Sequence, residues 1–390
     1  MYTIQTMDRI SPKGLEILPR EKFEIASEMT NPDAILIRSK KILDMELPDN
    51  LKAIARAGAG VNNIPIDRCS EKGIVVFNTP GANANSVKEL ALAGLLLSSR
   101  KIFEAMTWAK TLIGKGDEVP KLIEDGKSQF IGQEIKGKKL GIIGLGAIGV
   151  MVANDAQALG MDVSGFDPFI SLESAWKLSR AVKHALSFDT LLAESDYLTL
   201  HIPLDEKTKG ILNKEKFNLM KKGVRIMNFS RGGLVNNADL KEAIAKGIVA
   251  SYVTDFPDEE LLSTPNVLCI PHLGASTPEA EDNCAIMACQ QIYDFLTTGN
   301  IRNSVNFPNC EMDFNSTERL IVANKNIPNM VGQITTLLAS ENVNIREMIN
   351  RPKDGYAYNI INVDQEVSAS TLEKIKAIDG VLMVRLIKHS

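Results

Sequence analysis

The chain has 390 residues, of which 44% are hydrophobic, 24% charged and 5% aromatic, and its formal net charge is −4. This length predicts two or three domains, and the balance of residue types is that of a packed protein rather than a disordered or collagen-like one. The small negative charge argues against a general affinity for nucleic acid or anionic lipid, so we expect neither as a partner.

The sequence has no apolar stretch long enough to span a bilayer. The two longest, residues 90–97 and 140–153, are short, and the second contains four glycines, whereas a membrane span needs about 20 apolar residues. The N-terminus lacks a secretion signal, and the cysteines have no CxxC spacing or nearby histidine partners. We therefore expect a cytoplasmic protein without a metal site. Its buried, reduced thiols would be Cys69, Cys269, Cys284, Cys289 and Cys310.

The first 80 residues alternate short apolar runs with polar or helical segments, which predicts a small α/β domain. The runs are residues 2–6, 34–38, 53–57 and 75–78. Apolar residues then recur with helical spacing from Ser86 to about Leu112, with Asn85 or Ser86 as the expected N-cap. We expect one long helix here that joins two lobes.

The clearest periodicity lies in residues 138–272, where apolar runs are separated by segments with helical spacing. The runs are residues 140–144, 162–166, 197–202, 224–229, 250–255 and 267–271. This pattern predicts a doubly wound, mostly parallel sheet that binds its ligand at the carboxyl ends of the strands. A helical segment at 279–297 and a polar linker at 302–317 follow.

The last segment, residues 318–390, has the pattern of a separate small module. It predicts a strand, a helix at 329–340, a hairpin that turns at 353–355, a second helix at 370–377 and a strand at 381–387. This βαββαβ order is typical of a ferredoxin-like fold.

A glycine-rich turn follows the first strand of the doubly wound region. Gly144, Gly146 and Gly149 form a GxGxxG motif between an apolar strand and a helical pattern. The three glycines permit the tight turn, the approach of a pyrophosphate and the close packing of helix on strand. Asp167, 18 residues after Gly149, ends the next predicted strand and is placed to bind an adenosine ribose. An acidic group there favours NAD over NADP.

The sequence has four histidines, so a histidine acid or base has few candidates. His272 is the best placed, because it follows a predicted strand at its carboxyl end and precedes a glycine-containing loop. His201 also ends a strand and is interpreted as a structural or cofactor-lining residue. His184 and His389 are expected at the surface.

Two further charged residues stand just past predicted strands: Arg231 in Asn-Phe-Ser-Arg-Gly-Gly, and Glu259 in Thr-Asp-Phe-Pro-Asp-Glu-Glu. Hydride transfer from a 2-hydroxy acid needs a cation to orient the carboxylate, a base to take the hydroxyl proton, and a carboxylate to support the base. Arg231, His272 and Glu259 can fill these three roles.

These motifs together resemble the D-isomer-specific 2-hydroxyacid dehydrogenases. The resemblance rests on GLGAIG at 144–149, NFSRGG at 228–233 and PHLGAST at 271–277. It implies a Rossmann-type sheet inserted in a flavodoxin-like substrate-binding domain. The expected domains are 1–92 with 283–308 for substrate, 93–282 for NAD, and 318–390 for regulation.

The resemblance also implies the binding residues. Those for the cofactor are Gly144, Gly146, Ala147, Ile148, Gly149, Asp167, His201, Ile202, Pro203, Phe229, Ser230, Arg231, Asp255, His272, Gly274 and Ala275. Those for the substrate are Arg38, Ser39, Lys40, Ala59, Gly60, Val61, Asn83, Arg231 and His272. Family members usually carry one more residue between Asp255 and the following Phe, so Glu259 and Glu260 compete for the catalytic role. The Phe-Pro pair favours Glu259.

The C-terminal module resembles an ACT domain, the small amino-acid-binding module of many biosynthetic enzymes. The matching stretches are residues 324–334 and 342–345. They imply an amino-acid effector such as serine, held by Asn324, Asn326 and Asn344, whose amides can bind its charged ends. The open alternative is a module that only pairs with its copy in another subunit.

The expected activity is NAD-dependent oxidation at C2 of a phosphorylated D-2-hydroxy acid, because Arg38 and Lys40 suit a phosphate. Matching stretches at 36–40, 56–61 and 78–83 favour this substrate class. The alternatives are a dehydrogenase for another D-2-hydroxy acid and a non-catalytic NAD(H) sensor. The family also implies a homo-oligomer.

Overall fold

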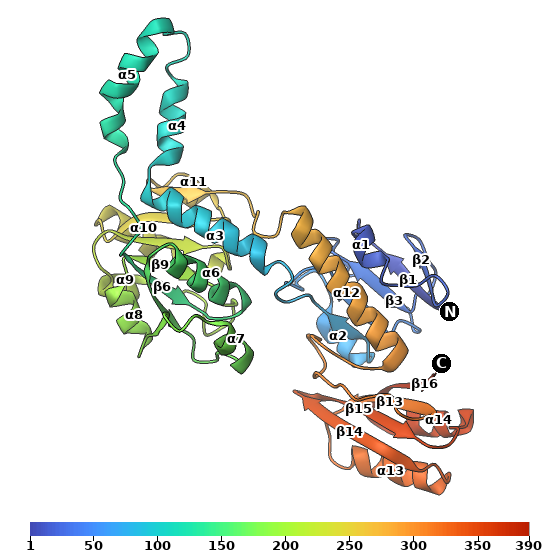
Figure 1. Cartoon of the computed structure of the whole chain (residues 1–390). Helices are drawn as coiled ribbons and strands as arrows, with labels where there is room; N and C mark the ends of the chain where they lie inside the picture. Colours follow the sequence, from blue (N-terminus) through green and yellow to red (C-terminus); the bar gives the residue numbers. More distant parts are fainter. Residues whose placement is uncertain (390) are drawn as a thin grey trace. The chain divides into compact units, whose positions relative to one another are not determined.

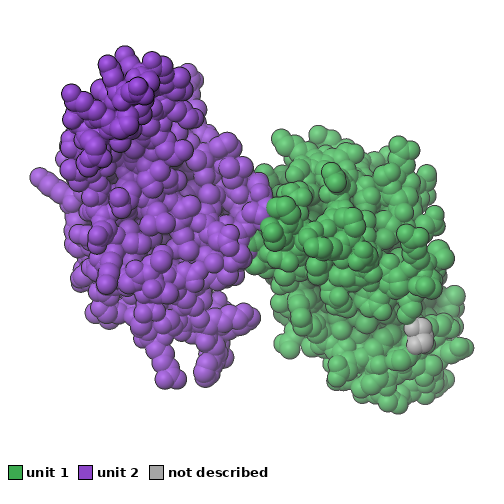
Figure 2. All heavy atoms as spheres, turned by 45° about the horizontal axis from the view of Figure 1, so that its top comes forward, with its two compact units in different colours: residues 1–83, 278–390 green, residues 84–277 purple. Residues whose placement is uncertain are grey.

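The computed structural model describes residues 1–389, and Ser390, the last residue of the predicted C-terminal module, lies outside the described residues. The chain divides into two compact units (Figure 2). Unit 1 contains residues 1–83 and the chain from Pro278 onward, and unit 2 contains Ala84–Thr277. In the described part of the chain, no helix has both the length and the apolar character needed to cross a membrane.

Unit 1 begins with a five-stranded parallel sheet in the order β2-β1-β3-β4-β5, the flavodoxin-like order that the resemblance implied. Its strands are β1 (Tyr2–Thr6), β2 (Phe23–Ala26), β3 (Ala34–Ile37), β4 (Ala53–Arg56) and β5 (Val75–Phe77). The strands β3 and β5 are buried along their whole length. Helices therefore cover both faces. They are α1 (Pro12–Leu15) and α12 (Pro278–Thr298) in one apolar core, and α2 (Ile66–Glu71) in the other.

The C-terminal module has the predicted βαββαβ order, which confirms the ferredoxin-like prediction. Its four-stranded antiparallel sheet runs in the order β14-β15-β13-β16. The elements are β13 (Glu318–Lys325), α13 (Met330–Ser340), β14 (Ile345–Lys353), β15 (Tyr356–Val363), α14 (Ala369–Lys376) and β16 (Val381–Lys388).

The two faces of this small sheet have different partners, because side chains alternate along a strand. Leu320 and Ile361 point into a core with α13 and α14. Ile321 and Ile360 point to the other face and join the core that contains α12. The module is thus packed on the rest of unit 1 through the face that lacks helices.

Unit 2 is built on a seven-stranded parallel sheet in the order β12-β11-β10-β9-β6-β7-β8, which confirms the doubly wound prediction. The strands are β6 (Lys139–Ile143), β7 (Asp162–Phe166), β8 (Lys183–His184), β9 (Tyr197–Leu200), β10 (Val224–Asn228), β11 (Val249–Thr254) and β12 (Val267–Cys269). The sequence did not predict β8, which has two exposed residues and no apolar run.

Helices cover both faces of this sheet. One core contains α3 (Ala84–Ser99) and α6 (Ala147–Ala158), and the other contains α8 (Phe188–Glu194), α9 (Lys214–Leu219) and α10 (Asn237–Ala245). Two short helices, α7 (Leu172–Lys177) and α11 (Glu259–Leu262), follow the ends of β7 and β11. The 3-10 helix Gly232–Leu234 follows β10.

The prediction of one helix from Ser86 to Leu112 was wrong. The chain forms α3 and then α4 (Ile102–Lys110), with Lys101 out of helical geometry at ψ 51°. Before the break, the hydroxyls of Ser98 and Ser99 both donate to the carbonyl of Leu95, and such bonds compete with the helix. The predicted cap Ser86 lies inside α3 and donates to the carbonyl of Gly274 instead.

After this break, α4 and α5 (Val119–Gly126) project from unit 2 as a helical arm (Figure 1). Neither helix has a buried residue. The 3-10 turns Gly116–Glu118 and Lys127–Phe130 complete the arm. The ring of Trp108, in the last turn of α4, lies 5.3 Å from that of Phe130.

Candidate active site and cofactor site

The carboxyl ends of the central strands of unit 2 lie at one edge of its sheet. The register places Ile143, Leu200, Asn228, Thr254 and Cys269 level with one another across five parallel strands. The loops that follow these residues carry the glycine turn and the predicted polar groups. Because parallel strands end on the same side, the fold gathers Gly144, His201, Arg231, Asp255 and His272 at this edge.

The glycine turn has the shape that a dinucleotide pyrophosphate requires. Gly144 has φ +93°, and a Cβ there would lie 2.6 Å from the carbonyl of His201. A Cβ on Gly149 would lie 2.0 Å from the carbonyl of Gly144. A Cβ on Gly146 would meet nothing within 4 Å. Gly146 therefore opens the turn to a ligand at the N-terminus of α6, where Ala147 and Ile148 begin the helix.

Asp167, at the end of β7, holds this turn in place. Its carboxylate accepts hydrogen bonds from the backbone N–H groups of Leu145 and Phe169, both at 2.8 Å. The carboxylate thus lies beside the glycine turn, where the sequence placed the ribose contact. The residues of the turn and Asp167 together fit a dinucleotide.

His201 ends β9 with a partly buried imidazole. Its Nε2 lies 3.0 Å from the hydroxyl of Thr199, and burial lowers the pKa of His201 to about 4. The neighbouring Ile202, which precedes Pro203, accepts a hydrogen bond at 2.5 Å from the hydroxyl of Ser230. The loops after β9 and β10 are therefore tied together at the sheet edge.

Arg231 is exposed directly after β10. Its Nη1 donates to the carbonyl of Ser230 at 2.6 Å. The buried amide of Asn228 donates to the carbonyl of Arg231 at 2.9 Å and accepts from the N–H of Ser230 at 3.1 Å. Phe229 is 5% exposed and packs in the core with α3. A buried amide and a buried ring thus fix the backbone from which the guanidinium extends.

Asp255, which directly follows β11, is a buried carboxylate at this edge of the sheet. It is 1% exposed, and its Oδ2 accepts from the N–H of Gly274 at 3.2 Å. In the described part of the chain, its buried Oδ1 has no hydrogen-bond partner. Burial raises the pKa of Asp255, and attraction to His272 opposes the rise. The ring of His272 is exposed and lies 4.8 Å from the ring of Phe256. Ala275 follows in the same loop.

The two glutamates that compete for the catalytic role have different surroundings. Glu259 is the first residue of α11, which is capped by Asp258, whereas Glu260 forms an ion pair with Lys241. Within residues 1–389 neither glutamate bonds to His272.

Unit 1 carries a cationic loop after β3, held by an aspartate that the sequence analysis missed. Oδ2 of Asp8 accepts from the backbone N–H groups of Arg38, Ser39 and Lys40 at 2.6, 2.9 and 3.0 Å. Nη1 of Arg38 pairs with Glu281 at 2.7 Å, and the Lys40 side chain is exposed. The sequence signal that could have identified Asp8 is the position of an acidic residue just after the first strand.

A second loop, after β4, presents backbone donors. Its carbonyls are occupied, because Asn78 donates to Ala59 at 2.6 Å and Arg56 donates to Gly60. Among the described residues, no acceptor pairs with the N–H groups of Ala59, Gly60 or Val61. These N–H groups can bind an anion. The predicted Asn83 lies in the turn before α3 and is the last residue of unit 1's first segment.

The three asparagines of the C-terminal module do not come together within one copy. Asn324 is 1% exposed, and its amide bonds to Lys325 and Asn359. Asn326 follows the end of β13, level with the hairpin turn, and Asn344 precedes β14 at the opposite end of the sheet. Asn344 donates to Asp364 at 2.8 Å.

Residues 92–274 match the family described as D-isomer specific 2-hydroxyacid dehydrogenase, NAD binding domain. The chain is 38% identical over 320 residues to D-3-phosphoglycerate dehydrogenase of Archaeoglobus fulgidus, covering 79% of this chain and 58% of that protein. It is 36% identical over 318 residues to hydroxypyruvate reductase of Thermotoga maritima, covering 76% of this chain and 98% of that protein.

Among solved structures, NAD⁺-bound 3-phosphoglycerate dehydrogenase of Entamoeba histolytica is similar, with a TM-score of 0.61 and 26% identity. That match covers 78% of this chain and 98% of the other. The chain spans 58% of the length of the Archaeoglobus relative, less than two thirds. The glycine turn and the match over residues 92–274 identify an NAD-binding domain. The chain therefore belongs to the D-isomer specific 2-hydroxyacid dehydrogenase family.

Proposed function

We propose that this chain is an NAD-dependent dehydrogenase that oxidises D-3-phosphoglycerate to 3-phosphohydroxypyruvate, the first step of serine biosynthesis. The observation that carries the proposal is the meeting of the glycine turn, Arg231 and His272 at one edge of the sheet of unit 2. The name of the Archaeoglobus relative supports this substrate. The five free thiols support a reducing, cytoplasmic location.

The reaction separates a hydride and a proton from the same alcohol. Bound NAD supplies the nicotinamide that accepts the hydride from C2. The imidazole of His272 takes the proton of the C2 hydroxyl as the carbonyl forms, and the guanidinium of Arg231 holds the substrate carboxylate and the developing oxygen. Removing such an acid or base lowers turnover by about 100- to 10,000-fold.

A carboxylate stabilises the protonated form of His272 in this scheme. Glu259 is our proposed catalytic carboxylate. Asp255 is the alternative, because electrostatic attraction to His272 lowers the pKa of Asp255 against the effect of burial. Glu260 is paired with Lys241 and is the weaker candidate. Comparing E259Q, E260Q and D255N in turnover assigns the role, because loss of the supporting charge lowers kcat and shifts its pH profile.

The phosphate and carboxylate of the substrate need cationic and N–H donors. Arg38 and Lys40 provide two positive charges in unit 1, and the loop at Ala59–Val61 provides unpaired N–H groups. Asp8 fixes the first of these loops through three hydrogen bonds. A dianionic phosphate suits this set better than a neutral group does.

The test is NADH formation with D-3-phosphoglycerate, with the keto product trapped. We expect turnover that H272N lowers by about 100-fold or more, while NADH binding is retained. H184N is the matched control, because His184 lies exposed on β8. Turnover of H272N equal to that of the wild type would reject this mechanism. Binding of NADH without any turnover would favour a sensor.

A second candidate is reduction of hydroxypyruvate, since the chain covers 98% of the Thermotoga hydroxypyruvate reductase. The same assay with D-glycerate and hydroxypyruvate distinguishes the two substrates. A preference for the phosphorylated acid that K40M abolishes would support the first proposal. Equal or faster turnover of the unphosphorylated acid would support the second.

We also propose that the chain forms a homo-oligomer through the arm of α4 and α5. Phe103 is 63% exposed, Met106 60% and Ile113 83%, although all three are apolar. Exposed apolar surface of this kind marks an interface. In light scattering, F103E with M106E should reduce the mass per particle, whereas L186E, at an equally exposed leucine (88%), should not. An unchanged mass in the arm variant would contradict this role.

The last proposal concerns serine as an effector of the ACT-like module. Because Asn326 and Asn344 lie at opposite ends of one sheet, a site that uses both amides needs two modules side by side. L-serine should lower turnover, and N344A should raise the serine concentration required, whereas D-serine should have no effect. Inhibition that is the same in N326A, N344A and the wild type would overturn this assignment.

A further inference from the structure

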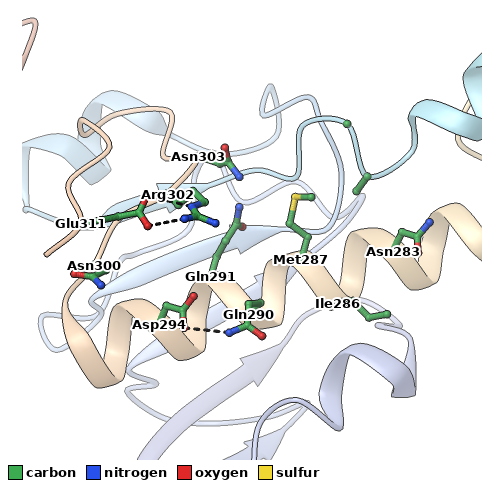
Figure 3. Close-up of a pocket in the computed structure, with 12 residues that line it drawn as sticks. Asn283, Ile286, Met287, Gln290, Gln291, Asp294, Asn300, Arg302, Asn303 and Glu311 are labelled. Carbon is green, nitrogen blue, oxygen red and sulfur yellow. Dashed lines mark hydrogen bonds and ion pairs between the residues drawn. The ribbon is translucent and has the colours of Figure 1, made fainter. Parts of the chain in front are cut away.

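Unit 1 contains a cavity of about 560 Å³ that none of the roles above uses. It lies along the exposed side of α12, between Ala82 in the loop after β5 and the linker at Asn300 and Arg302 (Figure 3). Met287, Gln291 and Asp294 line it from the helix. These three positions are four and three residues apart, so they form one stripe of the helix.

The cavity contains a buried acceptor without a donor. Gln291 is 6% exposed, and its Nε2 donates to the carbonyl of Asn78 at 2.9 Å. That bond fixes the orientation of the amide, and within residues 1–389 its buried Oε1 has no hydrogen-bond partner. A buried acceptor left unpaired destabilises the fold. Figure 3 shows the side chain rising from α12 between Arg302 and Met287. A ligand in this cavity would therefore gain by bringing an N–H donor.

The charges of the cavity favour a cation. Asp294 and Glu311 are acidic, whereas Arg302 is the one basic residue among those that line it. Arg302 is already bound to Glu311 through Nε at 3.1 Å and Nη2 at 2.7 Å. Asp294 has only the amide of Gln290, at 3.1 Å, as a hydrogen-bond donor. Burial raises the pKa of Asp294, and the amide of Gln290 and the charge of Arg302 oppose the rise only in part.

Part of the remaining wall is apolar, and the amides of Asn283, Gln290, Asn300 and Asn303 complete it. Ile286 is 37% exposed, and Met287 and Ala82 also line the cavity. An apolar surface beside an unpaired acceptor and a carboxylate fits a ligand that has a hydrocarbon stem and a cationic donor. We propose that this cavity binds a small aliphatic amine. Its ammonium group donates to Gln291 Oε1 and to Asp294, and its methylene groups lie against Ile286 and Met287.

The cavity also touches the attachment of the C-terminal module. Oδ1 of Asn300, which lines the cavity, accepts from the N–H of Met312 at 3.2 Å and from Nη1 of Arg319 at 3.2 Å. Arg319 lies in β13 and is fully buried. A ligand that binds only the folded cavity therefore raises the stability of this junction.

The test uses 1,4-diaminobutane as the probe and 1,4-butanediol, which has the same carbon chain without charge, as its control. Binding is followed by calorimetry and by the thermal unfolding temperature of the full chain. We expect saturable binding of the diamine and none of the diol. Loss of one hydrogen bond to a charged group should weaken binding about tenfold or more in D294N and in Q291M.

The matched control is D379N, which removes an exposed carboxylate of unit 1 far along the chain from the cavity residues. Its affinity should equal that of the wild type. D294N keeps the shape of the side chain, so it decides the outcome even if Q291M is unstable. Absence of saturable binding, equal affinity in D294N and the wild type, or equal weakening in D379N would each overturn the proposal.

Discussion

Besides the shared apolar core, the buried Arg319 helps to hold the C-terminal module on the rest of unit 1. Its guanidinium donates to Asn362 Oδ1 at 2.8 Å, Thr298 O at 2.8 Å, Asn300 Oδ1 at 3.2 Å and Met312 O at 2.9 Å. It also lies 4.4 Å from the centre of the Phe314 ring. Two of these acceptors belong to the end of α12 and the segment after it. The side chain therefore joins the module to its support.

The expected cost of Arg319→Met follows from these contacts. Four hydrogen bonds to a charged donor, at about 1.5 kcal/mol each, stabilise the fold by about 6 kcal/mol. Burial opposes this, since it disfavours the charged form and lowers the pKa of Arg319 to about 10, so the net gain is smaller than the sum of the bonds. We therefore expect R319M to lower the free energy of unfolding of unit 1 by about 3 kcal/mol, in the range typical of breaking a buried polar network.

Urea unfolding followed by far-ultraviolet circular dichroism measures this change. The R319M transition should move to lower urea by roughly 1 M or more, and amide hydrogen exchange should speed up in β13, β15 and the linker. Both tryptophans, Trp108 and Trp176, lie in unit 2, so tryptophan fluorescence reports the unfolding of that unit separately.

The matched control is R346M. Arg346 is 52% exposed in its side chain and pairs with Asp364 at 2.7 Å, and such surface pairs contribute less than about 1 kcal/mol. If R319M were as stable as the wild type, or no less stable than R346M, the buried arginine would not contribute to holding the module.

Three further predictions concern single side chains of known environment. His201 should stay neutral on nuclear magnetic resonance titration down to about pH 4. The unfolded chain takes this proton near pH 6.5. The free energy of unfolding should therefore fall as the pH drops from about 6.5 to about 4, and H201Q should remove this contribution to the pH dependence. Burial raises the pKa of the Cys69, Cys289 and Cys310 thiols to about 12. Cys284 is also buried, whereas Cys269 is only partly buried. The native chain should therefore react quickly with iodoacetamide at Cys269 alone. Rapid labelling of a second cysteine, detected by mass spectrometry, would contradict this prediction. D167S should weaken NADH binding about tenfold or more in a fluorescence titration. It should also reduce the preference for NADH over NADPH. If the binding of both cofactors were unchanged, Asp167 would only hold the backbone of the turn and would not contact the ribose.

Much of the site was predictable because it depends on local patterns. A glycine turn between an apolar strand and a helix, an acidic residue at the next strand end, and charged residues just past later strands all lie in short stretches of sequence. Parallel strands bring such stretches to one edge of a sheet, so Gly144, Arg231 and His272 could be predicted to meet. The edge strand β8 escaped prediction because its two exposed residues carry no apolar period.

Contacts between distant side chains were not predictable. The bond network of Asp8 to the Arg38 loop joins residues about 30 positions apart. Attraction between Asp255 and His272 joins groups from two different loops, and the role of Glu259 or Glu260 stays a prediction. The serines near Leu95 ended a helix whose apolar spacing continued past them.

The sequence by itself determined the doubly wound sheet, the ferredoxin-like module and the glycine turn, because hydrophobic periodicity and glycine geometry act over a few residues. Only the tertiary structure decided how Gln291 and Asp294 line one cavity, and how Arg319 came to be buried among carbonyl oxygens. Those arrangements depend on the packing of α12 against segments far away in the chain, and no local pattern records which polar groups such packing leaves unpaired.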